Sequence, residues 1–406
     1  MDISPLSLHA AGSQMAATSH LFADSRVTTV AHYSLRPRAW QTEVFMTNNK
    51  HHHAAAGYRN NYVASVTKSL RDLLRWQWQR YRKNLPPPPE IPTPTTPPDM
   101  DFILHNAGAG TDMVRAVTWL GHATSLVQAS GLNVLTDPIF SQRASPLRFA
   151  GPRRAQLPGI ALQALPHIDV VVISHNHYDH LDSDSIVSLA AQPGGPPHFL
   201  VPLGIKAWMA RLGITSVVEL DWWDVYRHPA SERAPAERRT AGGPPANSRA
   251  TEFHFTPAQH WSARSPFDRN KTLWGAWSVL GEDFHWYFSG DTGYSPDFVD
   301  TQRHFADRQS VANGGGFDVA LIAVGACEPR WFMQEQHVDP AEAVQIHVDL
   351  RAKRSVGVHW GTFALADEPL DHPIKALAAA RAARGVAEEA FALMAVGETR
   401  RFPSRG

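Results

Sequence analysis

The sequence predicts an α/β fold, an αββα sandwich in which two β-rich halves are each backed by helices. In the first half, short apolar runs between residues 115 and 223 alternate with helical patterns, which is typical of a layered α/β core. In the second half, between residues 251 and 363, aromatic-rich runs with partial alternation predict a further series of strands. Histidines and aspartates gather where several of these strands end, and open α/β sheets assemble their ligand sites at such positions.

The composition is that of a globular protein without a strong overall charge. Hydrophobic residues make up 43% of the 406 residues and 13 residues are Trp, enough for a large core in one or two domains. Lys plus Arg and Asp plus Glu number 38 each, so no global field attracts nucleic acid, and nucleic acid is not expected as a partner. The single cysteine, Cys327, excludes an intramolecular disulfide, fits a reducing, cytoplasmic location and is expected to be buried. No apolar stretch reaches about 18 residues, so we expect no membrane span.

The N-terminal region differs in composition from the rest of the chain. Residues 1–57 mix Ala, Ser, Thr and His without periodicity, which predicts a disordered leader. Residues 58–98 combine a basic amphipathic helix, expected over 69–85, with a proline-rich connector from residue 86. The apolar side chains that recur at helical spacing are Leu70, Leu74, Trp78, Tyr81 and Leu85. This stripe either docks on the main domain or lies on an anionic membrane surface, which would make the protein a peripheral membrane protein.

The main domain is expected over residues 99–404. The strands of its first half are predicted at 115–129, 132–140, 167–173, 198–202 and 216–223, with helices at 183–191 and 204–213. Residues 227–250 have almost no large apolar side chains and are expected to form a flexible surface insertion. The strands of the second half are predicted at 251–261, 272–281, 284–293, 317–326 and 354–363. Before the last strand, a helix is predicted at 339–353, with Asp339 as N-cap, Pro340 at its first position and Glu342 completing a capping box.

The stretch ISHNHYDHLD, residues 173–182, places three histidines and an aspartate within six positions, directly after a buried strand. Alternate residues of an extended segment share a face, so His175 and His177 are expected to point to one position, with Asp179 and His180 pointing to a neighbouring one. Imidazole and carboxylate without thiolate suit zinc, or less often iron or manganese. The motif therefore predicts two metal ions. The alternative is a polar surface turn with chance histidines, and the density of the motif argues against it.

Three more residues complete the predicted metal centre, because His260, Asp291 and His359 each lie at the end of a predicted strand. Any one of these histidines alone would be an ordinary histidine as often as a ligand. Asp291 is expected to bridge the two ions, which leaves an open position for a shared hydroxide. The first ion is assigned to His175, His177 and His260, and the second to Asp179, His180 and His359.

HNHYDH, the Gly-Asp pair at 290–291 and the late His359 together resemble the metallo-β-lactamase superfamily. Longer segments between residues 115 and 366 resemble N-acyl-phosphatidylethanolamine-hydrolysing phospholipase D, among them WLGHATSLVQ, LTDPIFSQRASP, ELDWW, EPRWFM and QHVDPAEAV. The resemblance implies a fold of the metallo-β-lactamase type, two Zn2+ per chain, a phospholipid substrate reached at a membrane surface, and assembly as a homodimer. The implied reaction is attack of a metal-bridged hydroxide on phosphorus, which releases N-acylethanolamine and leaves phosphatidic acid.

Two other functions are compatible with parts of these observations. A hydrolase of the same fold acting on a soluble lactone or phosphodiester is the main alternative. A nonenzymatic module that binds metal or lipid is poorly supported, because all seven ligands are present.

Asp179 and Asp291 are predicted to be catalytic residues as well as ligands. His337, just before the helix at 339–353, is predicted to orient the phosphate or to protonate the leaving oxygen, and the alternative is a hydrogen-bonded loop histidine.

Six residues are candidates for contact with the substrate: Tyr178, Gln336, Trp208, Met209, Arg148 and Phe149. Trp208 and Met209 also form a second candidate membrane contact. Around Arg148 and Phe149 this chain has SPLRFAG where animal relatives resemble SPSQYMG. A guanidinium and a phenyl ring are therefore predicted to face the head group, where an arginine would pair well with phosphate. The alternative is an Arg148 side chain that points to solvent, as a loop arginine usually does.

Overall fold

The structure is a computed structural model and describes residues 50–63, 66, 68–228 and 250–405. The predicted leader up to residue 49 and residues 229–249 of the predicted insertion lie outside these described residues. Among the helices of the described part of the chain, none is both long and apolar enough to cross a membrane.

Two seven-stranded sheets form the centre of the fold. The first has the order β16-β3-β4-β5-β6-β7-β8 and the second the order β15-β14-β13-β12-β11-β10-β9. In each sheet an antiparallel part joins a parallel part, at β5 in the first sheet and at β12 in the second. The strands of the first sheet are β3 (Arg115–Gly121), β4 (Thr124–Ala129), β5 (Leu132–Thr136), β6 (Val170–Val172), β7 (His198–Pro202), β8 (Val217–Leu220) and β16 (Thr399–Phe402). Those of the second are β9 (Val225–His228), β10 (Thr251–Thr256), β11 (Ala276–Leu280), β12 (His285–Phe288), β13 (Val319–Ala323), β14 (Ser355–Val358) and β15 (Phe391–Leu393).

A large apolar core joins the two sheets. It includes the buried Trp119 of the first sheet and the buried Phe253 and Trp277 of the second. Trp119 stacks on Trp360, which follows β14, with ring centroids 5.2 Å apart. Cys327 is buried, as predicted. Burial of such large side chains is the main term that stabilises the packing of one sheet on the other.

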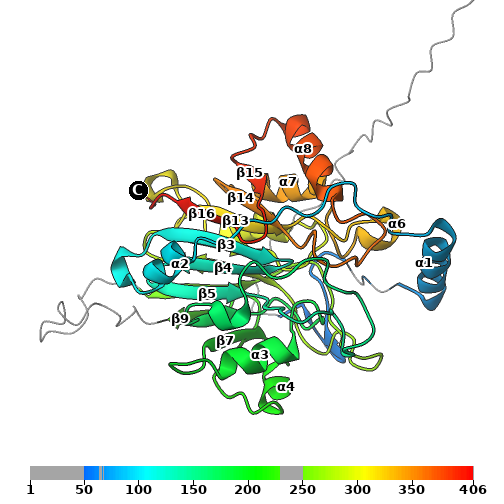
Figure 1. Ribbon diagram of the computed structural model, residues 1–406, viewed down its shortest axis with the longest axis horizontal. Coiled ribbons are helices and arrows are strands. Elements are labelled where there is room, and N and C mark those ends of the chain that lie inside the picture. Colours follow the sequence, from blue (N-terminus) through cyan, green and yellow to red (C-terminus); the bar gives the residue numbers. More distant parts are fainter. Residues whose placement is uncertain (1–49, 64–65, 67, 229–249, 406) are drawn as a thin grey trace, which may run out of the picture. The chain divides into compact units, whose positions relative to one another are not determined.

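Helices cover the outer faces of both sheets (Figure 1). Ile103, Ile186 and Met209 connect three helices to a second buried cluster on the first sheet, and Phe298 and Val344 belong to helices packed on the second. The chain is therefore an αββα sandwich, as the sequence predicts. The helices on the first sheet are α2 (Met100–Ala107), α3 (Ser183–Ala190) and α4 (Lys206–Ala210), and those on the second are α5 (Asp297–His304), α7 (Pro340–Asp349) and α8 (His372–Arg384). Short 3-10 helices are η1 (Gly110–Asp112), η2 (Leu162–Ala164) and η4 (Val311–Asn313).

Several predicted elements form where the sequence places them. β7 coincides with the predicted strand at 198–202. In α7 the Glu342 N–H donates to Asp339 Oδ1 at 2.8 Å, which confirms the predicted capping box. One boundary was wrong: residues 227 and 228, expected to begin the flexible insertion, belong to β9 because they pair with Glu252 and Thr251 of β10.

The last residues of the predicted leader are part of the folded domain, so that boundary was also wrong. Residues 50–57 contribute to a hairpin of β1 (His53–Ala54) and β2 (Gly57–Tyr58). The hairpin is held by buried Asp221, whose carboxylate accepts hydrogen bonds from His52 at 2.5 Å and His53 at 2.8 Å. This contact joins segments far apart in the sequence, and the composition of residues 1–57 gives no sign of it.

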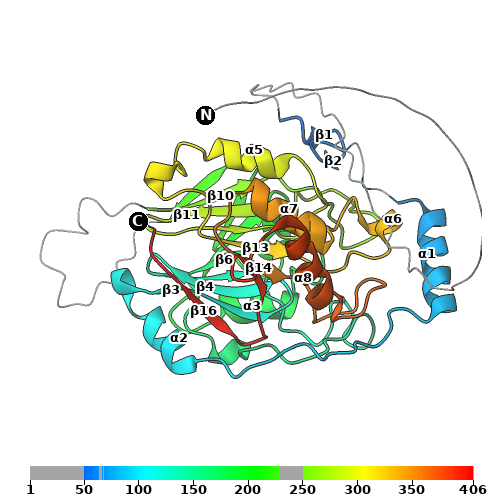
Figure 2. The same ribbon diagram turned by 90° about the horizontal axis from the view of Figure 1, so that it is seen from above.

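Helix α1 (Leu70–Lys83) forms as predicted, with Ser69 and Asp72 in a capping box at its start. It contacts the domain through Trp76, whose ring stacks on Phe332 at 4.6 Å and whose Nε1 donates to Asp367 Oδ1 at 2.9 Å. Phe332 belongs to α6 (Arg330–Met333), and both ribbon views show α1 beside α6 (Figures 1 and 2).

The predicted apolar stripe of α1 is exposed. With about 3.6 residues per turn, it lies on the side of the helix opposite Trp76. The expectation that this stripe docks on the main domain was therefore wrong, because Trp76 makes the docking contact instead. The exposed fractions are 71% for Leu70, 61% for Leu74, 57% for Trp78 and 88% for Tyr81.

Candidate active site

The seven predicted ligands converge although they come from four separate segments. The loop after β6 supplies four of them, and the segments that follow β10, β12 and β14 supply one each. Parallel strands bring the ends of β12 and β14 to the same edge of the second sheet, since both pair in parallel with β13. The seven residues are His175, His177, Asp179, His180, His260, Asp291 and His359.

The first group consists of His175, His177 and His260, whose ligand nitrogens lie within 4.8 Å of one another. His177 Nδ1 lies 2.8 Å from His175 Nε2 and 3.3 Å from His260 Nε2. The backbone carbonyl of Gln336 lies 2.9 Å from His260 Nδ1, which turns Nε2 of that ring toward the other two histidines. This grouping is the one predicted for the first ion.

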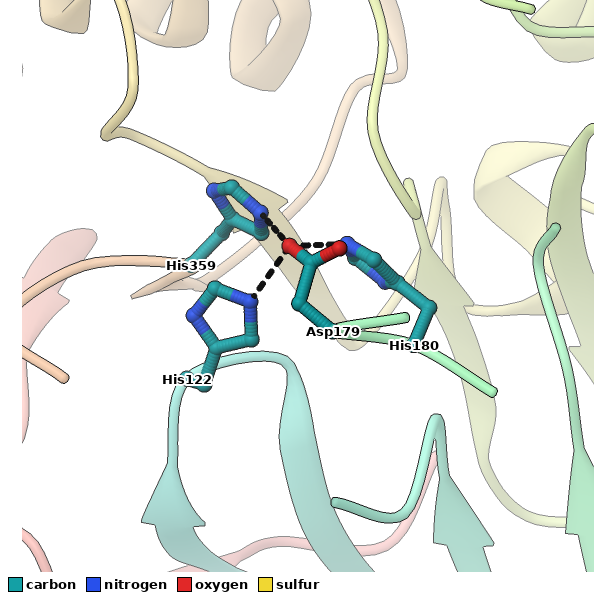
Figure 3. Close-up of side chains that lie close together, drawn as sticks. All are labelled: His122, Asp179, His180 and His359. Carbon is teal, nitrogen blue, oxygen red and sulfur yellow. Dashed lines mark hydrogen bonds and ion pairs between the residues drawn. The ribbon is translucent and has the colours of Figure 1, made fainter. Parts of the chain in front are cut away.

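The second group consists of Asp179, His180, His359 and a fourth residue, His122 (Figure 3). Asp179 Oδ2 lies 3.0 Å from Nε2 of His122, and 3.3 Å from Nε2 of both His180 and His359. His122 and His359 have φ angles of 53° and 60°, and the N–H of His359 donates to the carbonyl of His122 at 2.9 Å. Left-handed backbone at non-glycine residues costs free energy and is concentrated at functional sites.

Sequence reasoning missed His122. It is buried and directly follows β3, in the turn to β4, so the rule that identified His260 and His359 at strand ends could also have identified it. Its position inside the run WLGHATSLVQ, which was interpreted as two strands and a turn, concealed it.

Asp291 connects the two groups, as predicted for a bridging ligand. Its carboxylate lies 3.1 Å from Nε2 of both His180 and His359, and 3.9 Å from Nε2 of both His175 and His260. One carboxylate therefore faces nitrogens of both groups at once.

The two groups fit the predicted metal ions. Among the described residues, two buried atoms inside the cluster have no hydrogen-bond partner: His180 Nε2, 3.1 Å from the Asp291 carboxylate, and Asp291 Oδ1, 3.1 Å from His359 Nε2. Such buried polar atoms are costly unless they bind something. Imidazole nitrogens and carboxylate oxygens without thiolate are the donor set of zinc and similar borderline cations. His175, His177 and His260 would hold one ion, Asp179, His180 and His359 the other, and Asp291 both.

The charges of the centre support the same assignment. Burial and neighbouring imidazoles lower the pKa of His175 well below its usual value, and burial lowers the pKa of His260 to about 3, so both rings are neutral, the form in which imidazole can bind a metal. Burial opposes ionisation of Asp291, yet the surrounding imidazoles keep the pKa of its carboxyl well below the usual range. Burial also disfavours charge on His359, but the carboxylates of Asp291 and Asp179 raise its pKa to about 9. Two carboxylates, one of them buried, thus attract positive charge to this point.

A further carboxylate orients the centre from behind. Asp137 Oδ2 lies 2.7 Å from His180 Nδ1, and the N–H of Ser174 donates to Asp137 Oδ1 at 2.7 Å. Both residues are buried. A carboxylate that binds the second nitrogen of a ligating histidine selects the tautomer and holds the ring in place.

Comparison with known proteins identifies the family. A family model described as a β-lactamase superfamily domain matches residues 132–360, more than half of the chain. The chain belongs to the metallo-β-lactamase superfamily.

Several relatives carry more specific descriptions. N-acyl-phosphatidylethanolamine-hydrolyzing phospholipase D 1 of Caenorhabditis elegans is 40% identical over 61% of this chain and 64% of the worm protein. The mitochondrial enzyme of that description from Saccharomyces cerevisiae is 34% identical over 62% of this chain and 48% of the yeast protein, so both matches span less than two thirds of the relative. An uncharacterized protein of Mycobacterium tuberculosis is 37% identical over 75% of this chain and 72% of its own length. A possible metal-dependent hydrolase from Veillonella parvula, 16% identical, shares the fold with a TM-score of 0.51 over 71% of this chain and 99% of that chain.

His337 lies at the edge of the metal centre. Its Nδ1 is 3.8 Å from Asp291 Oδ2, beyond hydrogen-bond distance, and its ring centroid is 5.3 Å from that of His260. Burial lowers the pKa of His337 to about 3. A neutral imidazole still donates one hydrogen bond, which suits the predicted orienting role better than the predicted acid role.

A cavity of about 360 Å³ opens beside the metal centre. His177, Asp179, Asp291 and His337 line it, and so does Gln336, which was predicted as a substrate contact. The remaining lining residues are Val66, Lys68, Leu73, Trp76, Trp261, Arg269, Phe332, Met333 and Leu365. The inner side of α1 therefore forms one wall of the cavity.

The other predicted substrate contacts do not line this cavity. Tyr178 donates from its hydroxyl to the carbonyl of Arg264 at 2.9 Å, and the Arg264 guanidinium lies over the rings of both Tyr178 and Trp208. These two aromatic residues support the metal loop rather than contact a molecule in the cavity.

Met209 was wrongly assigned, and Arg148 and Phe149 lie on the surface outside the cavity. Met209 is completely buried in the core beneath the first sheet, so it contacts neither lipid nor membrane. Arg148 pairs with Asp184 at 2.9 Å on the surface, and the Phe149 ring beside it is exposed. The Arg148–Asp184 pair is exposed beside the first turn of α3, which agrees with the alternative in which the arginine points to solvent.

Proposed function

We propose that the protein is a zinc-dependent phosphodiesterase of the phospholipase D type that hydrolyses N-acyl-phosphatidylethanolamine to N-acylethanolamine and phosphatidic acid. The observation that carries the proposal is the cavity, which joins the metal centre to helix α1 through walls that are largely apolar. Similarity to the worm and yeast phospholipases supports the same substrate class.

The walls of the cavity suit a lipid phosphodiester. Trp76, Trp261 and Phe332 offer apolar surface for acyl chains. Arg269 offers a cation: its guanidinium lies 4.2 Å from the Trp261 ring centroid, and its buried Nε has no hydrogen-bond partner among the described residues. Such an arginine can donate to a phosphodiester oxygen without breaking an existing bond. Lys68 is less available because it pairs with Glu335 at 2.8 Å.

Each residue of the site has its own role in the proposed reaction. Two zinc ions bound in this centre would lower the pKa of bound water and would bring positive charge to the phosphodiester. Asp291 and Asp179 hold the two ligand groups together, and Asp137 orients His180. His337 donates a hydrogen bond to a nonbridging oxygen of the phosphodiester, and Arg269 holds the lipid in the cavity.

Helix α1 would bring this cavity to a membrane. Its exposed stripe, which begins at Leu70, offers apolar surface for insertion between lipids. Arg71, Arg75 and Arg82 lie along one flank of that stripe and would face anionic head groups. Peripheral association through α1 would bring to the membrane surface the helix that forms one wall of the cavity.

The test uses purified protein, vesicles that contain N-acyl-phosphatidylethanolamine, and ¹⁸O-labelled water. Attack of water on phosphorus puts the label into phosphatidic acid and none into N-acylethanolamine. Label in a released fatty acid would show ester or amide hydrolysis and overturn the proposal. Absence of lipid turnover together with hydrolysis of a soluble lactone would favour the alternative.

A further inference from the structure

The N-terminal segment of the described domain reaches the metal centre from behind. We call residues 50–62 the buttress segment. It contains the hairpin of β1 and β2 and continues to Asn60, which is 7% exposed. Asn60 touches neither the cavity nor a ligand nitrogen, but it contacts the backbone of a metal ligand.

Asn60 binds both backbone polar groups of His260. Its Nδ2 donates to the carbonyl of His260 at 2.9 Å, and its Oδ1 accepts from the N–H of His260 at 3.0 Å. Its Oδ1 also accepts from Trp274 Nε1 at 3.0 Å. The amide of Asn60 is therefore oriented by three contacts, two of which go to one ligand residue.

His260 depends on this contact because it lies beyond the end of β10. The neighbouring Gln259 is held by an isolated bridge to Gly293 and by the Thr292 hydroxyl, and sheet pairing stops there. The side chain of Asn60 thus takes the place of a neighbouring strand for His260. The Gln336 carbonyl holds the ring and Asn60 holds the backbone, so two outer contacts determine where His260 Nε2 points.

Contacts on both sides of Asn60 anchor the buttress segment. On one side, the hydrogen bonds of His52 and His53 to Asp221 are joined by Lys50, which also bonds that carboxylate. With both oxygens of Asp221 occupied, the cluster is satisfied as a set of hydrogen bonds. Closer to Asn60, the N–H of Tyr58 donates to the carbonyl of Asn270 at 2.8 Å.

On the other side, Asn61 Nδ2 donates to Asp297 Oδ1 at 2.8 Å.

Gly57, which precedes Asn60, permits a close approach to Asn270. At Gly57, an added Cβ would lie 2.1 Å from the Asn270 carbonyl oxygen, and the φ of 141° is one that other residues rarely adopt. The glycine therefore lets the segment approach the loop after β10 closely enough for Asn60 to reach His260.

We propose that Asn60 is a positioning residue that presents His260 to the first metal ion, so that the buttress segment is a working part of the catalytic centre. The proposal rests on the proposed function for its link to catalysis and on the geometry of His260 for its link to metal binding. Loss of an outer contact to a ligand typically costs about 10- to 100-fold in metal affinity or activity.

The experiment compares Asn60→Ala, Asn60→Asp and the control Asn61→Ala in the full chain. Asn61→Ala removes a hydrogen bond of the same segment without touching His260. Zinc affinity is measured by competition with a chelator, and the visible spectrum of the Co2+-substituted protein reports the ligand geometry. We expect Asn60→Ala to lower the affinity for one of the two ions about 10- to 100-fold and to alter the Co2+ spectrum.

Asn60→Asp keeps the acceptor for the His260 N–H and for Trp274 but loses the donor to the His260 carbonyl. We therefore expect it to lower the affinity for the same ion. It also covers the case in which the alanine variant folds poorly. Asn61→Ala should match the wild type. The proposal is overturned if folded Asn60→Ala binds both ions like the wild type, or if Asn61→Ala weakens metal binding equally, since the effect would then be a general loosening of the segment.

The two proposals fail separately. A wild-type protein that binds two ions in an Asn60-dependent way, but does not hydrolyse N-acyl-phosphatidylethanolamine, would overturn the proposed function and leave the role of Asn60 standing. An active lipid hydrolase whose metal affinity and kcat are both unaffected by Asn60→Ala would do the reverse.

Discussion

Replacing two exposed leucines of α1 should detach the protein from membranes without harming its active site. Leu70 and Leu74 are 71% and 61% exposed and contact neither the cavity nor the core. Burying a leucine side chain contributes about 1.5 to 3 kcal/mol. Scaled by the exposed fractions, insertion of the pair is worth about 2 to 4 kcal/mol, so Leu70→Gln/Leu74→Gln should weaken vesicle binding about 30-fold to several hundred-fold. Glutamine is a good helix former, so the helix itself should persist.

The assay is flotation with vesicles that contain anionic lipid, together with kcat/KM on vesicles and on a water-soluble, short-chain analogue. The double variant should lose activity on vesicles in proportion to its lost binding and keep its activity on the soluble analogue. The control is Leu104→Gln on α2, a similarly exposed leucine on the outer face of the first sheet. Unchanged vesicle binding in the double variant would refute the reasoning, as would an equal loss in the control.

Three further predictions concern single residues. His337→Ala should keep both metal ions and the fold but lose turnover by about 10²-fold or more, because His337 lies outside the two groups assigned to the ions yet lines the cavity; loss of metal would make it a ligand instead, together with Asp291 and His359. Arg269→Gln should raise KM for the lipid more than it lowers kcat, since it removes a contact of the bound phosphodiester; an unchanged KM would exclude that contact. Burial raises the pKa of Asp297 from 3.8 to about 6. At low pH the carboxyl is protonated in the folded and the unfolded state, so the shift does not change the free energy of unfolding. Above about pH 6 the carboxyl is ionised in both states, and the shift lowers the free energy of unfolding by about 3 kcal/mol. Asp297→Asn should accordingly stabilise the protein against urea more at pH 7.5 than at pH 4.5, and an equal effect at both pH values would contradict this assignment.

The metal centre was largely predictable because its signals are local. The six positions from His175 to His180 carry three histidines and an aspartate, and strand-end positions identified His260, Asp291 and His359. The same reasoning missed His122, because a single histidine between two strands resembles an ordinary turn.

Other parts of the structure depend on contacts that no local pattern records. The hairpin at 50–58 forms because Asp221, far along the chain, accepts hydrogen bonds from His52 and His53. Helix α1 was predicted, but its docking face was not, because Trp76 has its stacking and hydrogen-bonding partners in a distant segment. Periodicity shows that a helix has an apolar stripe; it does not show whether protein or lipid covers that stripe.

The substrate contacts were hard to predict for a similar reason. A position next to a motif does not determine where a side chain points. The Met209 side chain lies in the core beneath the first sheet, and Arg148 pairs with Asp184 on the surface. Cavity residues such as Trp261 and Arg269 carry no signal of their own in the sequence and were recognised only once the fold brought them beside His177.

The most direct test of the account is the zinc content of the wild type and of Asp291→Asn, measured on the same preparations as their hydrolysis of N-acyl-phosphatidylethanolamine. Asp291 faces both ligand groups, at 3.1 Å from His180 and His359 and at 3.9 Å from His175 and His260. A bridging carboxylate brings negative charge to two cations at once. We predict about two zinc ions per wild-type chain, and fewer ions with little or no lipid hydrolysis in the variant. Full zinc content with full activity in Asp291→Asn would contradict the bridged two-metal centre.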